Sequence, residues 1–471
     1  MANNSIKTLG DECTHRDPAR SALTSRAAST GSSKGQILPP PVCHKYGPAV
    51  QNPSTSQTQL SLPKDKIRIL LLEGVNDSAA LMMQAAGYSS VERLPKALDG
   101  DALREAVKGV HLLGIRSRTQ IDAGVIEAAD RLIAIGCFNV GTNQVDIDAA
   151  RRMGVPVFNA PFSNTRSVAE LVIGEIVMLL RRIIPKTAGA HAGRWEKSAA
   201  DSHEVRGKTL GIVGYGNIGS QLSYLAEAMG MRVIFYDHTN KLRHGNTQPT
   251  ESLAELLAES DVVTLHVPET PATHRMIGAA EIAAMKPGAY LINNSRGTVV
   301  DLDALAVALS EGRLRGAAID VFPIEPGSNA ERFQSPLQGL DNVILTPHVG
   351  GSTEEAQERI GAEVARKLID YSDVGSTVGA VNFPQVQLPI RPLGTRFIQV
   401  QRNLPGMLGR LNEVLARHAV NIAAQYYETY ADVGYVVLDA DASAADSQRV
   451  LAEIRALEGT IRARLLYEHR S

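Results

Sequence analysis

Short apolar runs alternate with stretches of helical periodicity over most of the chain. The apolar runs fall at 67–72, 110–115, 132–135, 210–213, 233–236, 261–268, 289–293, 317–322 and 343–348. Runs of this length between turn signals predict buried strands. Helical patterns occupy 77–86, 167–182, 221–229 and 353–370. This alternation predicts an α/β fold with parallel sheets.

The last part of the chain follows a different pattern. A proline-marked linker at 382–392 precedes a strand at 396–401 and a helix at 406–418. Strands at 420–427 and 434–439, a helix at 444–457 and a strand at 460–466 complete the order βαββαβ. That order predicts a small ferredoxin-like sandwich.

A glycine turn follows the strand at 210–213. Gly214, Gly216 and Gly219 have the spacing G-x-G-x-x-G, a helix is predicted at 221–229, and the next apolar run ends at Asp237. Such a turn lets a pyrophosphate approach the backbone and the helix N-terminus. A carboxylate at this distance suits a ribose and would repel a 2′-phosphate. The pattern predicts a dinucleotide site that prefers NAD over NADP.

The segment 159–166 is a turn-rich break before the long helix predicted at 167–182. Ser167 could cap this helix, and Glu170 three residues later would complete a capping box. Glu175 interrupts the apolar face of the same helix. A linker that leads into a long helix predicts a hinge between two domains.

Polar residues follow the predicted strands where they end. Arg116 and Arg118 follow the strand at 110–115, and either a carboxylate or phosphate contact or a solvated charge pair would explain them. Arg296, Glu325 and His348 follow three later strands, with Asp320 and glycines beside them. Carboxyl ends of strands converge on one crevice in an open α/β sheet.

The crevice residues suggest hydride transfer between a hydroxyl and a carbonyl. His348 could act as the base, Glu325 could fix its tautomer, and Arg296 could hold a carboxylate and polarise a carbonyl.

Composition sets the remaining limits. The chain has 471 residues, 44% hydrophobic residues, a net charge of −2 and three cysteines. This length predicts two to four domains, and this charge gives no field for nucleic acid or an anionic membrane. Three cysteines are too few for a disulfide framework, which favours a reducing compartment, so we expect a cytoplasmic protein. The cysteines do not have the spacing of metal ligands, so we expect no metal. Residues 1–63 are polar and predicted to be disordered.

Several motifs together resemble one family. They are 115–119, 141–146, 159–173, 214–219, 295–301, 320–326, 345–353 and 421–426. The chain resembles the D-2-hydroxyacid dehydrogenases, most closely the members that oxidise 3-phospho-D-glycerate and carry one C-terminal ACT domain. The resemblance implies a Rossmann-type NAD domain (164–350) inserted in a flavodoxin-like substrate domain (64–163 and 351–391), followed by a ferredoxin-like ACT domain (392–471).

The resemblance also implies roles for single residues. The catalytic set is Arg296, Glu325 and His348, and the substrate contacts are Arg116, Arg118 and Asn143. The NAD contacts, with the turn glycines, are Asn217, Ile218, Asp237, Asn294, Ser295, Asp320, Val349, Gly350 and Gly351. The implied reaction converts 3-phospho-D-glycerate and NAD⁺ to 3-phosphohydroxypyruvate and NADH, the first step of serine biosynthesis, and some relatives also reduce 2-oxoglutarate.

Relatives of this architecture are usually tetramers, and the loop of Trp195 reaches a neighbouring subunit in them. Their ACT domains often bind L-serine as an inhibitor through a histidine and two asparagines. The matching positions here are Gln401, Asn403 and Asn421. Glutamine can still form hydrogen bonds but carries no charge, so serine inhibition is a hypothesis.

Two other functions compete with this one. The first is a different D-2-hydroxyacid dehydrogenase, such as a hydroxypyruvate or glyoxylate reductase, which the catalytic set cannot distinguish. The second is a non-enzymatic, NAD-sensing corepressor on the same fold. The ACT domain argues against both, and Arg116 with Arg118 favours a phosphorylated substrate.

Overall fold

The computed structural model describes residues 59–60, 62–326, 331–389 and 394–468. The disorder predicted for residues 1–63 lies mostly outside these ranges. Strand β1 (Gln59–Leu60), within that predicted tail, instead pairs antiparallel with β17 (Thr460–Glu468). The described chain forms three sheets.

The first sheet is parallel and has five strands in the order β3-β2-β4-β5-β6. These are β2 (Ile69–Leu71), β3 (Val91–Arg93), β4 (Leu112–Ile115), β5 (Ala134–Cys137) and β6 (Val157–Phe158). The order is that of flavodoxin-like folds. A short 3₁₀ helix, η1 (Lys64–Lys66), precedes it.

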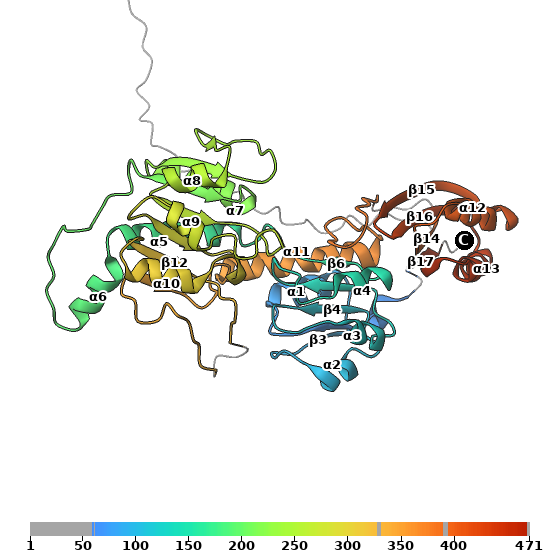
Figure 1. Ribbon diagram of the computed structural model, residues 1–471. Helices are drawn as coiled ribbons and strands as arrows, with labels where there is room; N and C mark the ends of the chain where they lie inside the picture. Colours follow the sequence, from blue (N-terminus) through green and yellow to red (C-terminus); the bar gives the residue numbers. More distant parts are fainter. Residues whose placement is uncertain (1–58, 61, 327–330, 390–393, 469–471) are drawn as a thin grey trace, which may run out of the picture. The chain divides into compact units, whose positions relative to one another are not determined.

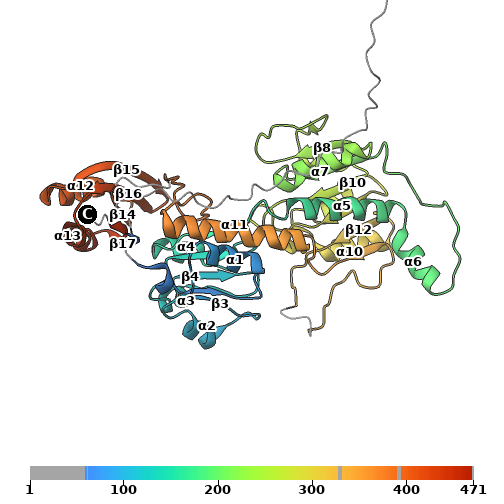
Figure 2. The ribbon, with the colours of Figure 1, turned by 180° about the vertical axis from the view of Figure 1, so that it is seen from behind.

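Helices cover both faces of this first sheet (Figures 1 and 2). One face packs on α1 (Asp77–Ala85) and on the much later α11 (Glu354–Asp373). The other face packs on α2 (Gly100–Ala106), α3 (Ala123–Ala128) and α4 (Ile147–Arg152).

The second sheet is parallel and has seven strands in the order β13-β12-β11-β10-β7-β8-β9. They are β7 (Thr209–Val213), β8 (Arg232–Tyr236), β9 (Gln248–Pro249), β10 (Val262–Leu265), β11 (Tyr290–Asn293), β12 (Gly316–Ile319) and β13 (Val343–Leu345). Strand order reverses between β7 and β10, which is the ligand-binding switch point of a Rossmann fold.

Two helical layers enclose the second sheet. Helices α5 (Thr165–Leu180) and α7 (Asn217–Ala228) pack on one face. Helices α8 (Leu253–Glu259), α9 (Ala279–Ala284) and α10 (Leu302–Ser310) pack on the other. Helix α6 (Ile183–His191) follows α5 (Figure 1). A 3₁₀ turn, η2 (Gly297–Val299), follows β11.

The third sheet is antiparallel, in the order β1-β17-β14-β16-β15. It contains β14 (Thr395–Arg402), β15 (Asn421–Tyr430) and β16 (Val433–Asp441), with α12 (Met407–Arg417) and α13 (Ala444–Ala456) on one face. The predicted βαββαβ unit is therefore confirmed. Its other face shares an apolar cluster with α11 and with 383–388.

Local details differ from the sequence predictions. Helix α5 begins two residues early, with Asn164 as N-cap, and Ser167 Oγ lies 2.8 Å from Thr353 Oγ1 instead of capping the helix. The predicted Ser167 cap is therefore wrong. Helix α7 begins at Asn217, so Gly219 lies in its first turn. Within the described ranges, no helix has both the length and the apolarity of a membrane span.

A buried ion pair lies where the third sheet meets the rest of the chain. Arg396 and Asp439 are 0% and 1% exposed, and two nitrogens of the guanidinium bind the two carboxylate oxygens at 2.6 and 2.7 Å. The same guanidinium donates to the carbonyl of Val374, at the end of α11, at 2.9 Å. Arg396 therefore links the ACT sheet to the α11 region.

We expect Arg396→Met to destabilise the protein by about 3–5 kcal/mol, because it leaves the Asp439 carboxylate buried without its partner. Urea unfolding followed by circular dichroism measures this. Arg449→Met is the control, since its partner Asp446 is on the surface of the same domain, and it should leave the unfolding midpoint nearly unchanged. Equal unfolding midpoints for the two variants would show that the buried Arg396–Asp439 pair does not stabilise the protein more than the surface pair does.

Candidate active site

The glycine turn after β7 has the shape of a phosphate cradle. A side chain at Gly214, whose φ is +93°, would collide with the carbonyl of His266, and one at Gly219 would collide with the carbonyl of Gly214. At Gly216, by contrast, a Cβ would meet no protein atom within 4 Å. The fold therefore requires Gly214 and Gly219, while Gly216 keeps space free beside the N-terminus of α7. That space suits a pyrophosphate.

Asp237 lies just beyond the end of β8. Its carboxylate accepts hydrogen bonds from the backbone N–H of Tyr215 at 2.9 Å and from the N–H and hydroxyl of Thr239 at 3.0 and 2.9 Å. Burial raises its pKa, but these hydrogen bonds and Lys241 outweigh burial and hold the pKa below its usual value. An ionised carboxylate beside the glycine turn agrees with the predicted contact to a ribose.

Close backbone packing places Arg296. A Cβ on Gly297 would overlap the backbone of Phe322 and Pro323, so only glycine allows this approach between the segments after β11 and β12. The Asn293 amide donates to the Arg296 carbonyl at 2.9 Å, and Arg296 Nη1 donates to the Ser295 carbonyl at 2.6 Å. Burial lowers the pKa of Arg296, while Glu269 and Glu325 act in the opposite direction.

Glu325 and His348 form a hydrogen-bonded pair. Glu325 Oε2 lies 2.9 Å from His348 Nδ1, and Glu325 Oε1 accepts from the Phe322 N–H at 3.1 Å. The hydrogen bond from Glu325 raises the pKa of His348 above its usual value, although burial opposes the shift. A carboxylate on Nδ1 leaves Nε2 free to exchange a proton with a ligand.

Asp320, at the end of β12, organises the loop that carries His348. It is 1% exposed, and its carboxylate accepts from the Thr346 hydroxyl at 2.6 Å and from the N–H groups of Val349 and Gly350, both at 2.8 Å. Its carbonyl accepts from the His348 N–H at 2.8 Å. These bonds hold His348 at a φ of +54°, in the left-handed region that non-glycine residues seldom adopt.

The arginine loop after β4 is fixed by Glu73, which the sequence patterns did not indicate. The Glu73 carboxylate accepts from the backbone N–H groups of Arg116, Arg118 and Thr119 at 3.1, 3.0 and 2.8 Å. Gln144, also not predicted, is buried and donates to the Arg116 carbonyl at 2.7 Å. Both arginine side chains therefore project from a rigid backbone, with Arg118 exposed.

The loop at 141–143 lies next to Arg296. A Cβ on Gly141 would lie 3.0 Å from Asn143 Oδ1 and 3.2 Å from Arg296 Nη2. The structure therefore brings Asn143, predicted as a substrate contact, close to the predicted catalytic arginine.

The other predicted cofactor residues follow the carboxyl ends of strands in the second sheet. Asn217 and Ile218 begin α7, Ser295 follows β11, and Val349, Gly350 and Gly351 follow β13. The Asn294 side chain, however, turns inward and donates to the buried Glu175 on α5 at 2.9 Å. Glu175 was not predicted as a site residue. The sequence did contain a signal for it, because an acidic residue interrupts the apolar face of the helix at this position.

The predicted effector residues do not come together within one chain. Gln401 pairs in register with Gly434, which pairs with Thr429, whereas Asn421 pairs with Asp441 at the far end of the sheet. Gln401 is fully buried, and neither polar atom of its side chain has a hydrogen-bond partner among the described residues. Asn403 and Asn421 are exposed.

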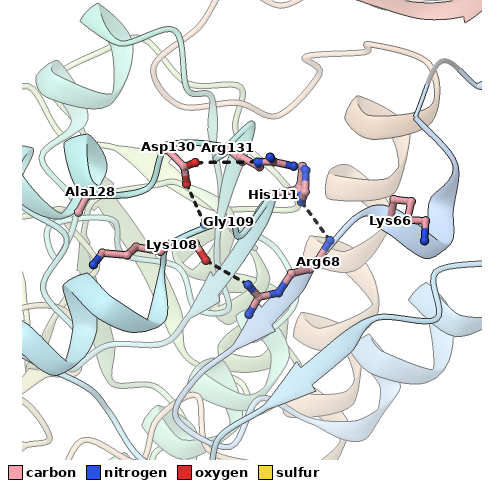
Figure 3. A pocket seen from close by; sticks show the side chains of 8 residues that line it. All are labelled: Lys66, Arg68, Lys108, Gly109, His111, Ala128, Asp130 and Arg131. Carbon is pink, nitrogen blue, oxygen red and sulfur yellow. Dashed lines mark hydrogen bonds and ion pairs between the residues drawn. The ribbon is translucent and has the colours of Figure 1, made fainter.

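A cavity of about 620 Å³ lies elsewhere, at the amino ends of β2, β4 and β5 (Figure 3). It is lined by Lys66, Arg68, Lys108, Gly109, His111, Ala128, Asp130 and Arg131. Each of its cations has a carboxylate neighbour, namely Asp65, Glu92, Glu105 and Asp130. The balanced charge gives no reason to assign it a ligand.

A Glu–His pair and an arginine beside a dinucleotide turn define an NAD-dependent dehydrogenase. Comparisons agree with this class. Residues 173–350 match the family described as D-isomer specific 2-hydroxyacid dehydrogenase, NAD binding domain, and residues 398–462 match an AHAS small subunit-like ACT domain. The crystal structure of D-lactate dehydrogenase from Aquifex aeolicus, complexed with NAD and lactic acid, is similar with a TM-score of 0.58 and 28% identity. The match covers 64% of this chain and 95% of the lactate dehydrogenase chain.

Two relatives are similar over nearly their whole length. D-3-phosphoglycerate dehydrogenase of Escherichia coli K12 is 57% identical over 409 residues, covering 87% of this chain and 100% of its own. The enzyme of the same name from Haemophilus influenzae is 56% identical, covering 87% and 99%. The chain therefore belongs to the D-3-phosphoglycerate dehydrogenase family.

We expect Glu325→Gln to lower the pKa of His348, because it weakens the hydrogen bond and removes the negative charge that raise this pKa. His348 would then lose its proton at lower pH, so the alkaline fall of NADH-dependent reduction should move to lower pH. At neutral pH the rate should drop by about 10- to 100-fold. Initial rates from pH 6 to pH 9 measure both effects. An unchanged alkaline limb would show that Glu325 does not act through His348.

Proposed function

We propose that this chain oxidises 3-phospho-D-glycerate with NAD⁺ to 3-phosphohydroxypyruvate, the first step of serine biosynthesis. The observation that carries the proposal is the Glu325–His348 pair at 2.9 Å beside Arg296. Gly214, Gly216, Gly219 and Asp237 would hold the cofactor, which when bound supplies the hydride acceptor.

Residues of the chain are assigned to proton transfer and to substrate binding. His348 Nε2 takes the proton of the C2 hydroxyl as the C2 hydride leaves, and Glu325 stabilises the resulting imidazolium. Arg296 binds the substrate carboxylate and stabilises charge on the C2 oxygen. In the reverse direction, the protonated His348 returns its proton to that oxygen.

Arg116 and Arg118 are proposed to bind the phosphate. They follow β4 at the carboxyl edge of the first sheet, and Glu73 holds the backbone of both. Guanidinium groups suit phosphate oxygens, which favours the phosphorylated substrate over hydroxypyruvate or glyoxylate. Activity on 2-oxoglutarate is a secondary proposal from the same carboxylate contacts.

We expect wild-type protein to reduce 3-phosphohydroxypyruvate faster than hydroxypyruvate, measured as NADH absorbance. Arg118→Ala should raise the KM for 3-phosphohydroxypyruvate about tenfold or more, a loss of about 1.4 kcal/mol, and change the KM for hydroxypyruvate little. Arg104→Ala, which changes an exposed side chain on α2, is the matched control.

Faster turnover of hydroxypyruvate by the wild type would favour the alternative reductase. Binding of NADH without reduction of any 2-oxo acid would favour the corepressor instead.

Assembly and regulation are further proposals. Trp195 is 88% exposed in the segment after α6, which supports a role at a subunit interface in a homotetramer. Exposed Asn403 and Asn421 lie at opposite ends of the ACT sheet, so a serine site using both needs a second chain. We propose domain limits at 64–163 with 351–391, 164–350 and 392–471, and a cytoplasmic location.

We expect L-serine to slow NADH oxidation, and Asn403→Ala to raise the serine concentration needed for half-inhibition. L-Alanine, which lacks the hydroxyl, is the control ligand. Initial rates across a millimolar titration measure the effect. Unchanged rates at millimolar serine would show that the ACT domain of this chain does not respond to serine.

A further inference from the structure

Glu175 is a buried carboxyl beneath the proposed active site. It lies on α5 and is 0% exposed. Its Oε2 accepts from Asn294 Nδ2 at 2.9 Å. Asn294 follows β11 directly, is 7% exposed, and lies two residues before Arg296. A single side-chain hydrogen bond thus connects α5 with the segment that carries the catalytic arginine.

Two acceptors of this pair have no donor. Among the described residues, neither Glu175 Oε1 nor Asn294 Oδ1 has a hydrogen-bond partner, and both atoms are buried. Leaving two buried acceptors unpaired is costly. One proton on Oε1 of the carboxyl would satisfy both, because a carboxylic acid and a primary amide can exchange two hydrogen bonds in a ring.

We propose that Glu175 is a neutral acid whose proton is shared with Asn294 Oδ1, and that this acid–amide pair positions the segment 294–296 for catalysis. Glu175 is thus a positioning residue, since it acts through Asn294 and touches no reacting atom. The inference rests on the proposed dehydrogenase function and adds a protonation requirement to it.

The surroundings favour the neutral form. Burial is the main reason that the pKa of Glu175 rises to about 8. The nearby Asp320 also raises this pKa, whereas the hydrogen bond from Asn294 lowers it. Asp320, at the end of β12, is the charged group that acts on Glu175. The hydrophobic cluster that packs against α5 from the sheet and from α7 includes Ile292, Ala318 and Leu222. Its titratable members are Tyr215 and Tyr290.

Ionisation would break the ring. A carboxylate can accept from the Asn294 amide but cannot donate to Oδ1, so two lone pairs would face each other without a proton. The segment 294–296 would then lose one of its two ties to α5. Oxidation of the alcohol needs neutral His348, whose fraction grows with pH. A fall in the oxidation rate above about pH 8 therefore reports Glu175 and not His348.

The test is Glu175→Gln, which has the same shape, does not titrate, and can form two amide–amide hydrogen bonds with Asn294. We measure kcat for 3-phospho-D-glycerate oxidation from pH 6 to pH 10, with NAD⁺ and substrate saturating. Both proteins should show the rise that follows His348. The wild type should fall above about pH 8, by about tenfold per pH unit, and the variant should stay level.

Glu170→Gln is the matched control, because this glutamate lies on the same helix but is exposed. It should keep the wild-type profile. An alkaline fall that is equally steep in Glu175→Gln would overturn the proposal. Failure of the wild type to oxidise 3-phospho-D-glycerate at any pH would instead overturn the proposed function.

A second measurement does not depend on activity. Because folding raises the pKa of Glu175, its contribution to stability is complete below its ordinary pKa of 4.5 and is lost as pH rises to about 8. The urea midpoint of Glu175→Gln should therefore rise relative to the wild type between pH 5 and pH 8. A constant difference, or a variant that cannot fold, would also overturn the proposal.

Discussion

The position of His348 depends on the buried carboxylate of Asp320. With 1% of its surface exposed, this carboxylate meets one hydroxyl and two backbone N–H groups of the loop after β13, and its own carbonyl takes the His348 N–H. Such bonds to an ionised acceptor are strong. They offset the strained backbone of His348 and place its imidazole against Glu325. The same negative charge favours the proton on Glu175.

Two helices connect the nucleotide-binding sheet with the first sheet, and their N-termini meet. Ser167 on α5 contacts Thr353, the N-cap of α11, and a Cβ on Gly351 would press against the Asn164 side chain. Helix α11 then runs along the first sheet to the ACT sheet, where Arg396 binds the Val374 carbonyl. One continuous helix therefore begins just after the loop that carries His348 and ends against the ACT sheet.

Much of the site could be predicted because of one general rule. Parallel strands place the residues that follow them at a common edge, so the strand pattern alone was enough to group Arg296, Glu325 and His348. The same rule does not identify the residues that hold the loops of the site in place. Glu73 binds three backbone N–H groups and Gln144 binds carbonyls, and backbone partners leave no trace in side-chain patterns. Helix starts were misplaced where Asn164 and Gly216 act as N-caps without a side-chain hydrogen bond.

Local patterns in the chain were enough to establish the architecture and the chemistry, because hydrophobic periodicity, glycine spacing and strand-end residues are read within short segments. Packing settled which side chains support that chemistry, since this depends on contacts between distant segments. Asn294 illustrates the difference: the family resemblance implied a cofactor contact at this position, and packing turns its side chain onto Glu175, 119 residues away. The ACT sheet shows it again, because strand register alone separates Gln401 from Asn421.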